Sequence, residues 1–169
     1  MQKLLDIVDA NDAVVGQCSL AEKHEYGHIT RNVAVFIQDS DGKFVISKRA
    51  LTKSVEPGLY DVSVCGHVDA GEDYMTAALR ELDEELGITA PLQELAVVYR
   101  EFPYKWIIIK HFTWHFRGRS DSPIVLSDEV EEYHKFSPEE MLTLFHEHPE
   151  LFTYSFAKEF AVVEEFINI

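Results

Sequence analysis

Three glutamates near the middle of the chain have the type and spacing needed to hold a metal ion. Glu81, Glu84 and Glu85 stand at positions i, i+3 and i+4, so their carboxylates share one face if this stretch is a helix. Carboxylate oxygens suit Mg²⁺ or Mn²⁺, hard cations that also bind substrate phosphates. The alternative for three clustered glutamates is an acidic helix face exposed to solvent.

The stretch from Asp73 to Leu86 has the apolar period of a helix that would carry this cluster. At spacings of four, three and four, the sequence predicts one apolar stripe of Met75, Leu79, Leu82 and Leu86. The glutamates lie roughly 130° away from that stripe, so one side can pack on a sheet while the other presents oxygen donors. Arg80 can pair with a neighbouring glutamate, and Glu72 in the preceding loop can fold back as a further ligand.

The spacing from Gly66 to Ile88 resembles the Nudix box. That pattern is a glycine, five residues, a glutamate, seven residues and an Arg-Glu pair, followed at fixed distances by Glu-Glu and glycine. Every defined position is filled, by Gly66, Glu72, Arg80, Glu81, Leu82, Glu84, Glu85, Gly87 and Ile88. The resemblance implies a mixed sheet flanked by helices, and hydrolysis of a nucleoside diphosphate linked to another group by attack of water on phosphorus.

The resemblance also implies a role for each polar residue. Mg²⁺ or Mn²⁺ would be bound by Glu81, Glu84 and Glu85, joined by the Gly66 carbonyl and Glu72. Glu84 and Glu85 are the candidates for the base that removes a proton from water, with Arg80 beside them in the catalytic group. Glu129 resembles a later acidic position that joins the site in some members, and its alternative is a surface loop carboxylate.

The flank from Lys48 to His67 resembles the isopentenyl-diphosphate isomerase branch of the same superfamily. There Cys65 would be the thiol that moves a proton on an alkene carbon, and His67 a metal ligand. Three departures count against isomerase activity. The stretch 107–111 lacks the Glu-x-Glu expected on the strand facing the cysteine, a further histidine is replaced near Thr30, and the box is intact where isomerases often have a degraded one. We therefore expect Cys65 to be a buried strand residue, and His67 to be either a ligand or a structural histidine.

Two cations before the box are the expected contacts to substrate phosphate. The expected substrate-binding residues are Arg49, Lys53, His67 and Glu129, and the two cations among them would contact the phosphates. The alternative for both cations is solvated charge at the end of a strand. In the run 106–116, alternate residues place His111, Thr113 and His115 on one face. That pattern predicts either the polar wall of a pocket or an edge strand.

The remaining elements predict a mixed α/β domain with a mixed β-sheet sandwiched between α-helices, spanning residues 1–169. An N-terminal hairpin covers about 3–17, and 17–31 are irregular with one helical turn. Strands are expected at 32–37, 43–48, 59–64, 95–102, 106–116 and 129–136, the first two forming a hairpin. Helices follow at about 138–167, begun by a capping box at Ser137 and closed by a stripe of Phe156, Phe160, Val163 and Ile167.

Composition narrows the function classes. The chain has 169 residues and a formal net charge of −15, which repels a phosphate backbone and argues against nucleic-acid binding. No run approaches the roughly 20 apolar residues of a membrane span, the N-terminus lacks the apolar core of a signal peptide, and two cysteines are too few for a disulfide framework. We expect a cytoplasmic protein acting on a small diphosphate-containing molecule. Residues 138–169 cover the sheet or form a subunit contact, which leaves a homodimer open.

Three functions remain in view. The leading one is a metal-dependent pyrophosphohydrolase acting on a nucleoside di- or triphosphate or a related nucleotide derivative. The second is an isomerase of isopentenyl diphosphate using Cys65, and the third a non-catalytic module that binds nucleotides. The complete box argues against the third, since binding alone does not require Arg80 and the three glutamates together.

Overall fold

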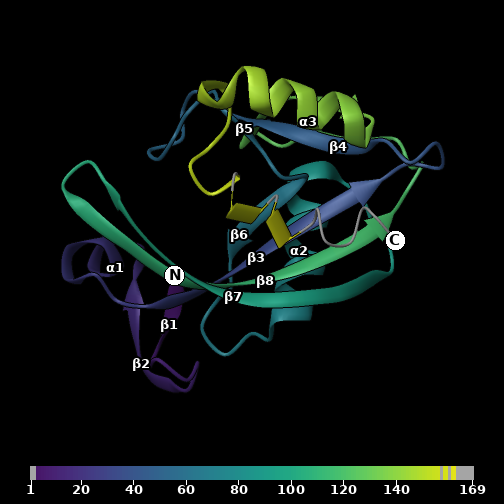
Figure 1. Cartoon of the computed structure of the whole chain (residues 1–169). Coiled ribbons are helices and arrows are strands. Elements are labelled where there is room, and N and C mark those ends of the chain that lie inside the picture. Colours follow the sequence, from purple (N-terminus) through teal and green to yellow (C-terminus); the bar gives the residue numbers. More distant parts are fainter. Residues whose placement is uncertain (1–2, 157, 160, 163–169) are drawn as a thin grey trace.

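A mixed β-sheet with helices on both faces forms the body of the protein, which confirms the predicted fold class (Figure 1). The computed structural model describes residues 3–156, 158–159 and 161–162. Within that part of the chain the main sheet has seven strands, and a separate two-stranded sheet precedes it. The strands are β1 (Leu4–Val8), β2 (Val14–Ser19), β3 (Thr30–Gln38), β4 (Phe44–Arg49), β5 (Tyr60–Asp61), β6 (Val64–His67), β7 (Leu92–Tyr104), β8 (Ile107–Arg119) and β9 (Val130–Phe136). The helices are α1 (Leu20–Tyr26), α2 (Tyr74–Leu86), α3 (Pro138–Glu147) and the short 3₁₀ turn η1 (Pro149–Leu151).

Strand β3 is the centre of the main sheet. It pairs in parallel with β8 over its whole length and antiparallel with the short strand β6. Strand β7 continues into β8 through a long antiparallel hairpin. Because β8 lies between β3 and β7, the edge-strand alternative for the run 106–116 is wrong, and His111, Thr113 and His115 are all buried.

The predicted hairpin between 32–37 and 43–48 is only partly formed. The chain does turn back after Gln38, but β3 and β4 pair only at Gln38 and Phe44 next to the turn. Beyond it β4 separates from β3 and pairs with β9 on one side and β5 on the other. This divergence opens the sheet beside β6. The single predicted strand 59–64 is accordingly two short strands, β5 and β6, in different parts of the sheet.

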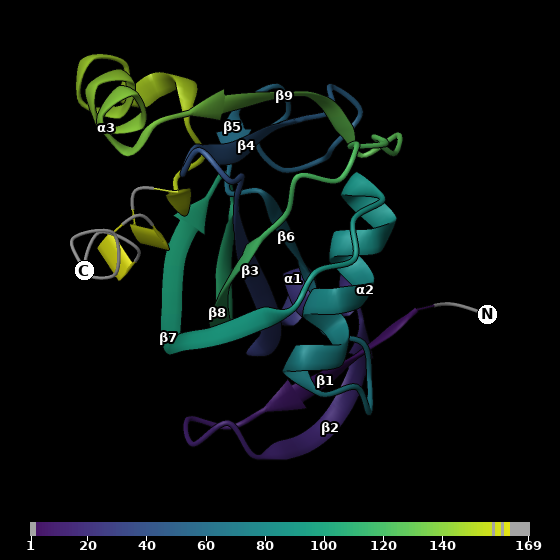
Figure 2. The same ribbon diagram turned by 90° about the vertical axis from the view of Figure 1, so that its right-hand side faces the viewer.

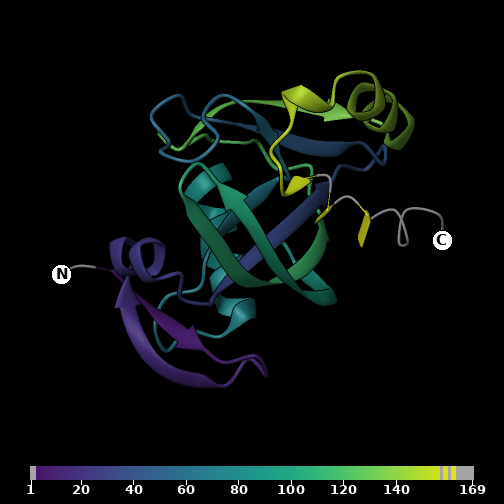
Figure 3. The same cartoon turned by 60° about the vertical axis from the view of Figure 1, so that its left-hand side comes forward.

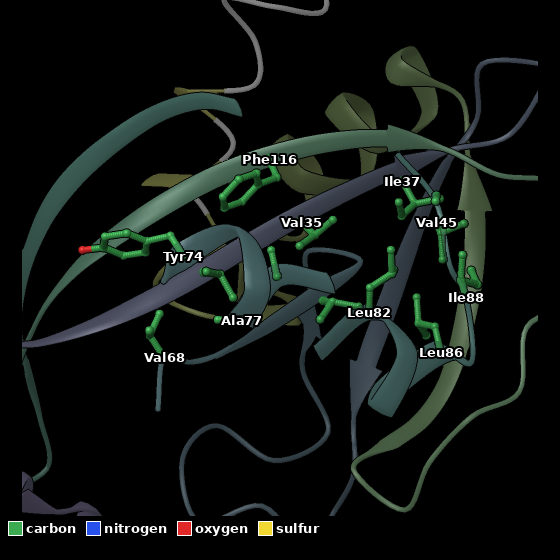
Figure 4. Packing of buried hydrophobic residues seen from close by; sticks show 14 residues of the cluster. Val35, Ile37, Val45, Val68, Tyr74, Ala77, Leu82, Leu86, Ile88 and Phe116 are labelled. Atoms are coloured by element: carbon green, nitrogen blue, oxygen red, sulfur yellow. The ribbon is translucent and has the colours of Figure 1, made fainter. Parts of the chain in front are cut away.

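Helix α2 packs against one face of the sheet, and its ends follow from local chemistry. The Asp73 side chain accepts a hydrogen bond from the Thr76 backbone, and Gly87 ends the helix in the left-handed conformation. Figure 4 shows Leu82, Leu86 and Ala77 facing residues of the central strands, among them Val35, Ile37 and Phe116. The predicted stripe is partly wrong, because Leu79 is exposed and the small residues Ala77 and Ala78 let the helix approach the sheet instead.

The opposite face of the sheet is covered by α3 and the chain that follows it (Figure 2). The capping box at Ser137 is confirmed: its hydroxyl accepts from the Glu140 backbone and the Glu140 carboxylate accepts from the Ser137 backbone. Met141, Phe152 and Phe156 pack there on Ala34 and Phe36 of β3. Of the predicted closing stripe, Phe160, Val163 and Ile167 lie outside the described residues.

The N-terminal hairpin and α1 lie at the end of the molecule away from α3 (Figures 1 and 3). The hairpin is formed by β1 and β2, as predicted, but the stretch 17–31 is more regular than expected. Strand β2 runs on to Ser19, which caps α1 with Glu22, and Gly27 ends that helix. In the part of the chain that is described, no helix combines the length and apolar character needed to cross a membrane.

Candidate active site

Arg80 fixes the loop before α2 to the helix itself. Its Nε and Nη2 bond the two carboxylate oxygens of Glu72, at 2.9 and 2.8 Å. Its Nη1 bonds Glu81 at 2.7 Å and Glu84 at 3.1 Å, and Nη2 also reaches the His67 carbonyl oxygen at 3.0 Å. These five contacts use all the donor directions of a guanidinium group. The carboxylates around it raise the pKa of Arg80, so it stays charged.

Gly66 is required by the close approach of a glutamate. A Cβ at this position would lie 2.1 Å from the Cδ of Glu81 and within 2.5 Å of both its carboxylate oxygens. A side chain at this position would force the Glu81 carboxylate to move, since real Cβ atoms do not come under 3.0 Å of such a neighbour. The glycine of the box therefore lets the Glu81 carboxylate lie directly on the backbone of β6.

The three box glutamates are not equally exposed. Glu81 and Glu85 are buried and Glu84 is exposed, so the expectation that all three face outward from α2 is only partly right. The reason is that α2 lies alongside β6, which covers the part of the helix next to the apolar face. Burial raises the pKa of Glu81, and burial together with the charge of Glu81 raises the pKa of Glu85 to about 8. Two buried carboxylates that repel each other are a setting that a cation would stabilise.

A cavity of about 400 Å³ opens beside these glutamates. Most of the site residues predicted from the sequence line this cavity. They come from four separate stretches of the chain. The predicted residues on its wall are Arg49, Lys53, Gly66, His67, Glu81, Glu84, Glu85 and Glu129. Arg80 and Glu72 are not on this wall, and their contacts give them the task of holding the loop and the glutamates in position.

Both predicted phosphate-binding cations are already paired. The Arg49 guanidinium lies 3.3 Å from the Asp61 carboxylate and donates to the Val55 carbonyl oxygen. The Lys53 ammonium forms an ion pair with the Glu129 carboxylate. Each side chain is largely shielded from solvent, which does not fit the alternative of solvated charge at a strand end. An anion in the cavity would therefore meet cations whose positions are set by carboxylates.

Cys65 lies on β6 and contributes to the cavity wall. Burial, together with the nearby charges of Asp61 and Glu159, raises the pKa of its thiol well above the ordinary value, so it stays protonated. The expected strand position is confirmed, but Cys65 is only partly buried. The sequence predicted only that 107–111 supplies no carboxylate opposite the cysteine, and the carboxylates that act on Cys65 come instead from Asp61 on β5 and from Glu159 in the C-terminal segment. Asp61 is paired with Arg49, and Glu159 with His115.

The sequence did not identify Lys23 and Asn32, which line the same cavity. Lys23 comes from α1, and its Nζ lies 2.8 Å from His67 Nε2. Asn32 and the expected wall residue His111 come from neighbouring central strands, and both are buried. The alternation in β8 indicated a polar wall that includes His111, but no local signal places Lys23 beside His67, because that contact depends on how α1 packs.

The donor set fits a hard divalent cation by its chemistry. Glu81, Glu84, Glu85 and Gly66 all line the cavity, the Glu81 carboxylate lies against Gly66, and the pKa of Glu85 is raised by burial and by the charge of Glu81. Among the described residues, no three His, Cys, Asp or Glu side chains form a complete cluster around one point. Two of the candidate ligands, Glu81 and Glu84, instead accept hydrogen bonds from the Arg80 guanidinium.

Comparison with known proteins agrees with this geometry. Residues 28–155 match the model of the NUDIX domain. The chain is 32% identical over 160 residues to isopentenyl-diphosphate Delta-isomerase 2 of Photorhabdus laumondii, covering 94% of this chain and 90% of that protein. It is 35% identical over 141 residues to an uncharacterised Nudix hydrolase of Pseudomonas aeruginosa, covering 81% and 80%. A crystal structure from Deinococcus radiodurans superposes with a TM-score of 0.74 at 27% identity, covering 92% of this chain and 96% of that one.

The protein therefore belongs to the Nudix family, and its relatives include proteins named as hydrolases and proteins named as isopentenyl-diphosphate isomerases. Both resemblances seen in the sequence are confirmed at the level of the family and its branch.

Proposed function

We propose that this protein is a divalent-metal-dependent hydrolase that cleaves the diphosphate linkage of a nucleoside di- or triphosphate or a related nucleotide derivative. The observation that carries the proposal is one cavity wall holding three box glutamates together with Arg49 and Lys53. Carboxylates to hold a cation and cations to hold phosphate are the two requirements for hydrolysis of a phosphate anhydride.

The residues divide this work between them. Glu81, Glu84, Glu85 and the Gly66 carbonyl would hold Mg²⁺ or Mn²⁺, which when bound neutralises phosphate charge and lowers the pKa of water. Arg80 and Glu72 hold the loop and helix that carry these ligands. Arg49 and Lys53 orient the phosphates, and either Glu84 or Glu85 removes the proton of the attacking water.

The test is hydrolysis of a panel of nucleoside diphosphates, triphosphates, nucleotide sugars and isoprenyl diphosphates, with and without Mg²⁺, with products separated by chromatography. We expect Mg²⁺-dependent cleavage of at least one nucleotide. In water enriched in ¹⁸O, the label should enter a phosphate group, because water attacks phosphorus. Absence of cleavage across the nucleotides contradicts the proposal.

A second candidate function is isomerisation of isopentenyl diphosphate. It is favoured by the position of the protonated Cys65 thiol on the cavity wall near Asp61 and Glu159, and by the 32% identity to a protein named as an isomerase. The two functions are separated by Cys65→Ala. A hydrolase should keep its turnover within about threefold, whereas an isomerase should lose its activity, because the proton donor is removed. Conversion of isopentenyl diphosphate to its allylic isomer, with no hydrolysis, would favour this candidate.

A further inference from the structure

The amino group of Lys23 is buried at the wall of the cavity, and no carboxylate of the described residues pairs with it. The residue is 3% exposed, and in the described part of the chain the partner of its Nζ is the ring nitrogen Nε2 of His67. Burial lowers the pKa of Lys23 to about 8, so the group is still mainly an ammonium at neutral pH. Buried ammonium groups are normally paired with an anion or fully hydrogen-bonded.

The histidines around Lys23 do not supply that anion, because an imidazole ring is neutral or cationic. Burial lowers the pKa of His111 to about 3. The His67 ring can accept one N–H of the ammonium at Nε2. Two further N–H groups of the ammonium remain available to a molecule in the cavity.

Other polar atoms at this end of the cavity also lack partners. Asn32 Oδ1 and His111 Nδ1 are buried and make no hydrogen bond among the described residues, and both side chains line the cavity. Asn32 stands opposite His67 in the pairing of β3 with β6, so the two lie side by side on one face. The cavity wall also includes the apolar side chains of Leu5, Leu20, Phe102 and Ile109. In native structures such buried polar atoms are satisfied by bound water or by a ligand.

This polar group lines the same cavity as the glutamates that would hold metal, and His67 directly follows Gly66 in β6. Lys23 is not among the main charged neighbours that shift the pKa of Glu85, which are Glu81, Lys53, Glu129 and Asp61. The cavity wall thus combines carboxylates and paired cations with an ammonium, an amide oxygen and an imidazole. A diphosphate held by Arg49 and Lys53 would leave its organic part to meet the second set of groups.

We propose that Lys23, held on His67, selects the substrate by donating a hydrogen bond to an acceptor on its organic part, with Asn32 and His111 as further contacts. The proposal rests on the proposed function and names the residues that would recognise the nucleoside part of its substrate. A hydrocarbon chain would offer no acceptor to the remaining N–H groups of Lys23 and no donor to the Asn32 amide oxygen, which lowers affinity by roughly tenfold to a hundredfold for each group.

The experiment measures binding by titration calorimetry in Mg²⁺, using probes that are not hydrolysed. These are the α,β-methylene analogues of the adenosine, guanosine, cytidine and uridine diphosphates, methylenediphosphonate without an organic group, and its dimethylallyl ester. We expect at least one nucleoside analogue to bind about tenfold or more tightly than the last two. Lys23→Met should weaken that binding about tenfold or more and change methylenediphosphonate by less than about twofold.

Matched variants complete the test. Lys43→Met removes an exposed lysine of the turn between β3 and β4 and should change neither affinity. Asn32→Ala should weaken the same nucleoside analogue as Lys23→Met does, which keeps the proposal testable if either variant folds poorly. Equal loss for methylenediphosphonate would assign Lys23 to phosphate and overturn the proposal. Unchanged affinity in Lys23→Met, or preferred binding of the dimethylallyl ester, would also overturn it.

The same measurements separate this inference from the proposed function. Mg²⁺-dependent hydrolysis by the wild-type protein with no effect of Lys23→Met on nucleoside binding leaves the hydrolase standing and removes the role of Lys23. Binding that depends on Lys23, without hydrolysis of any nucleotide, contradicts the hydrolase alone. Failure of the wild-type protein to bind any nucleoside analogue contradicts both.

Discussion

Gly66 leaves room for the Glu81 carboxylate, which occupies the space that a side chain would need. We expect Gly66→Ala to displace Glu81, to lower the free energy of unfolding by about 1–3 kcal/mol through overpacking, and to weaken Mn²⁺ binding. Thermal melting and Mn²⁺ electron paramagnetic resonance measure the two effects.

The matched control is Gly16→Ala in β2. An added Cβ there meets Ile7 at 3.7 Å, which is ordinary contact, so neither melting temperature nor Mn²⁺ affinity should change much. Unaltered Mn²⁺ binding in Gly66→Ala would mean that the position of Glu81 is unimportant for the metal.

Glu84 and Glu85 make the sharpest prediction about the chemistry. Each of Glu84→Gln and Glu85→Gln should reduce turnover by about 10²-fold or more with the fold intact, because a glutamine is neither a base nor an anionic ligand. Turnover under saturating Mg²⁺ and nucleotide is the measurement, with circular dichroism to check the fold. Asp83→Asn on the same helix is exposed and should keep wild-type turnover. Wild-type turnover in both glutamine variants would remove these residues from the active site.

Helix α1 carries the buried ammonium of Lys23, and burial of this charge destabilises the folded protein. Lys23 has a folded-state pKa of about 8, below its ordinary value of 10.5, so the unfolded chain binds more protons between these values. The free energy of unfolding therefore rises with pH from about 8 to 10.5 through this group. Lys23→Met should be more stable than the wild type by on the order of 3 kcal/mol at pH 7, and the difference should shrink by pH 10.

Urea unfolding of both proteins at pH 7, 8.5 and 10 checks this prediction, and the difference between them cancels the titration of other groups. Lys43→Met removes an exposed lysine, so its stability difference from the wild type should not depend on pH in this way. A stability difference that stays constant over this range would show that Lys23 does not titrate as its burial requires.

The elements also show where sequence information ends. Helix α2 could be located from its period, its cap at Asp73 and its end at Gly87, because these are local signals. The separation of β4 from β3 could not, since it depends on pairing with β9, which lies far along the chain. The exposure of Leu79 and the burial of Glu81 and Glu85 likewise depend on where β6 lies against the helix, which periodicity does not contain.

For the whole molecule, the net charge of −15 means that cation binding and salt screening both affect stability. A divalent ion that binds the folded state adds about 2.7 kcal/mol at one hundred times its Kd. We expect 10 mM Mg²⁺ to raise the melting temperature, by roughly 2–4 °C for each kcal/mol that binding adds to the free energy of unfolding. NaCl at equal ionic strength should give a smaller rise, and Glu81→Gln should lose the extra effect of Mg²⁺. Equal rises in Mg²⁺ and NaCl would indicate screening alone.

At the scale of the whole molecule, one part of the candidate site was predictable and the other was not. The residues that we propose to hold metal are encoded within 66–88, where loop and helix are continuous in sequence, and so they could be named. The residues that we propose to select the substrate come from α1, β3, β6 and β8, and only tertiary packing brings Lys23 to His67 or leaves Asn32 Oδ1 unsatisfied. These residues could therefore not be named from the sequence as one group.

The parallel pairing of β3 with β8 has a consequence for the order of folding. The chain reaches Thr30 early, but its partner His111 follows only after the box and the whole of β7 have been made. During synthesis from the N-terminus, β3 must wait for a partner that emerges late, and contacts so distant in sequence form slowly. The glutamate end of the cavity can thus form from local contacts, whereas the wall holding His111 closes only when β8 arrives.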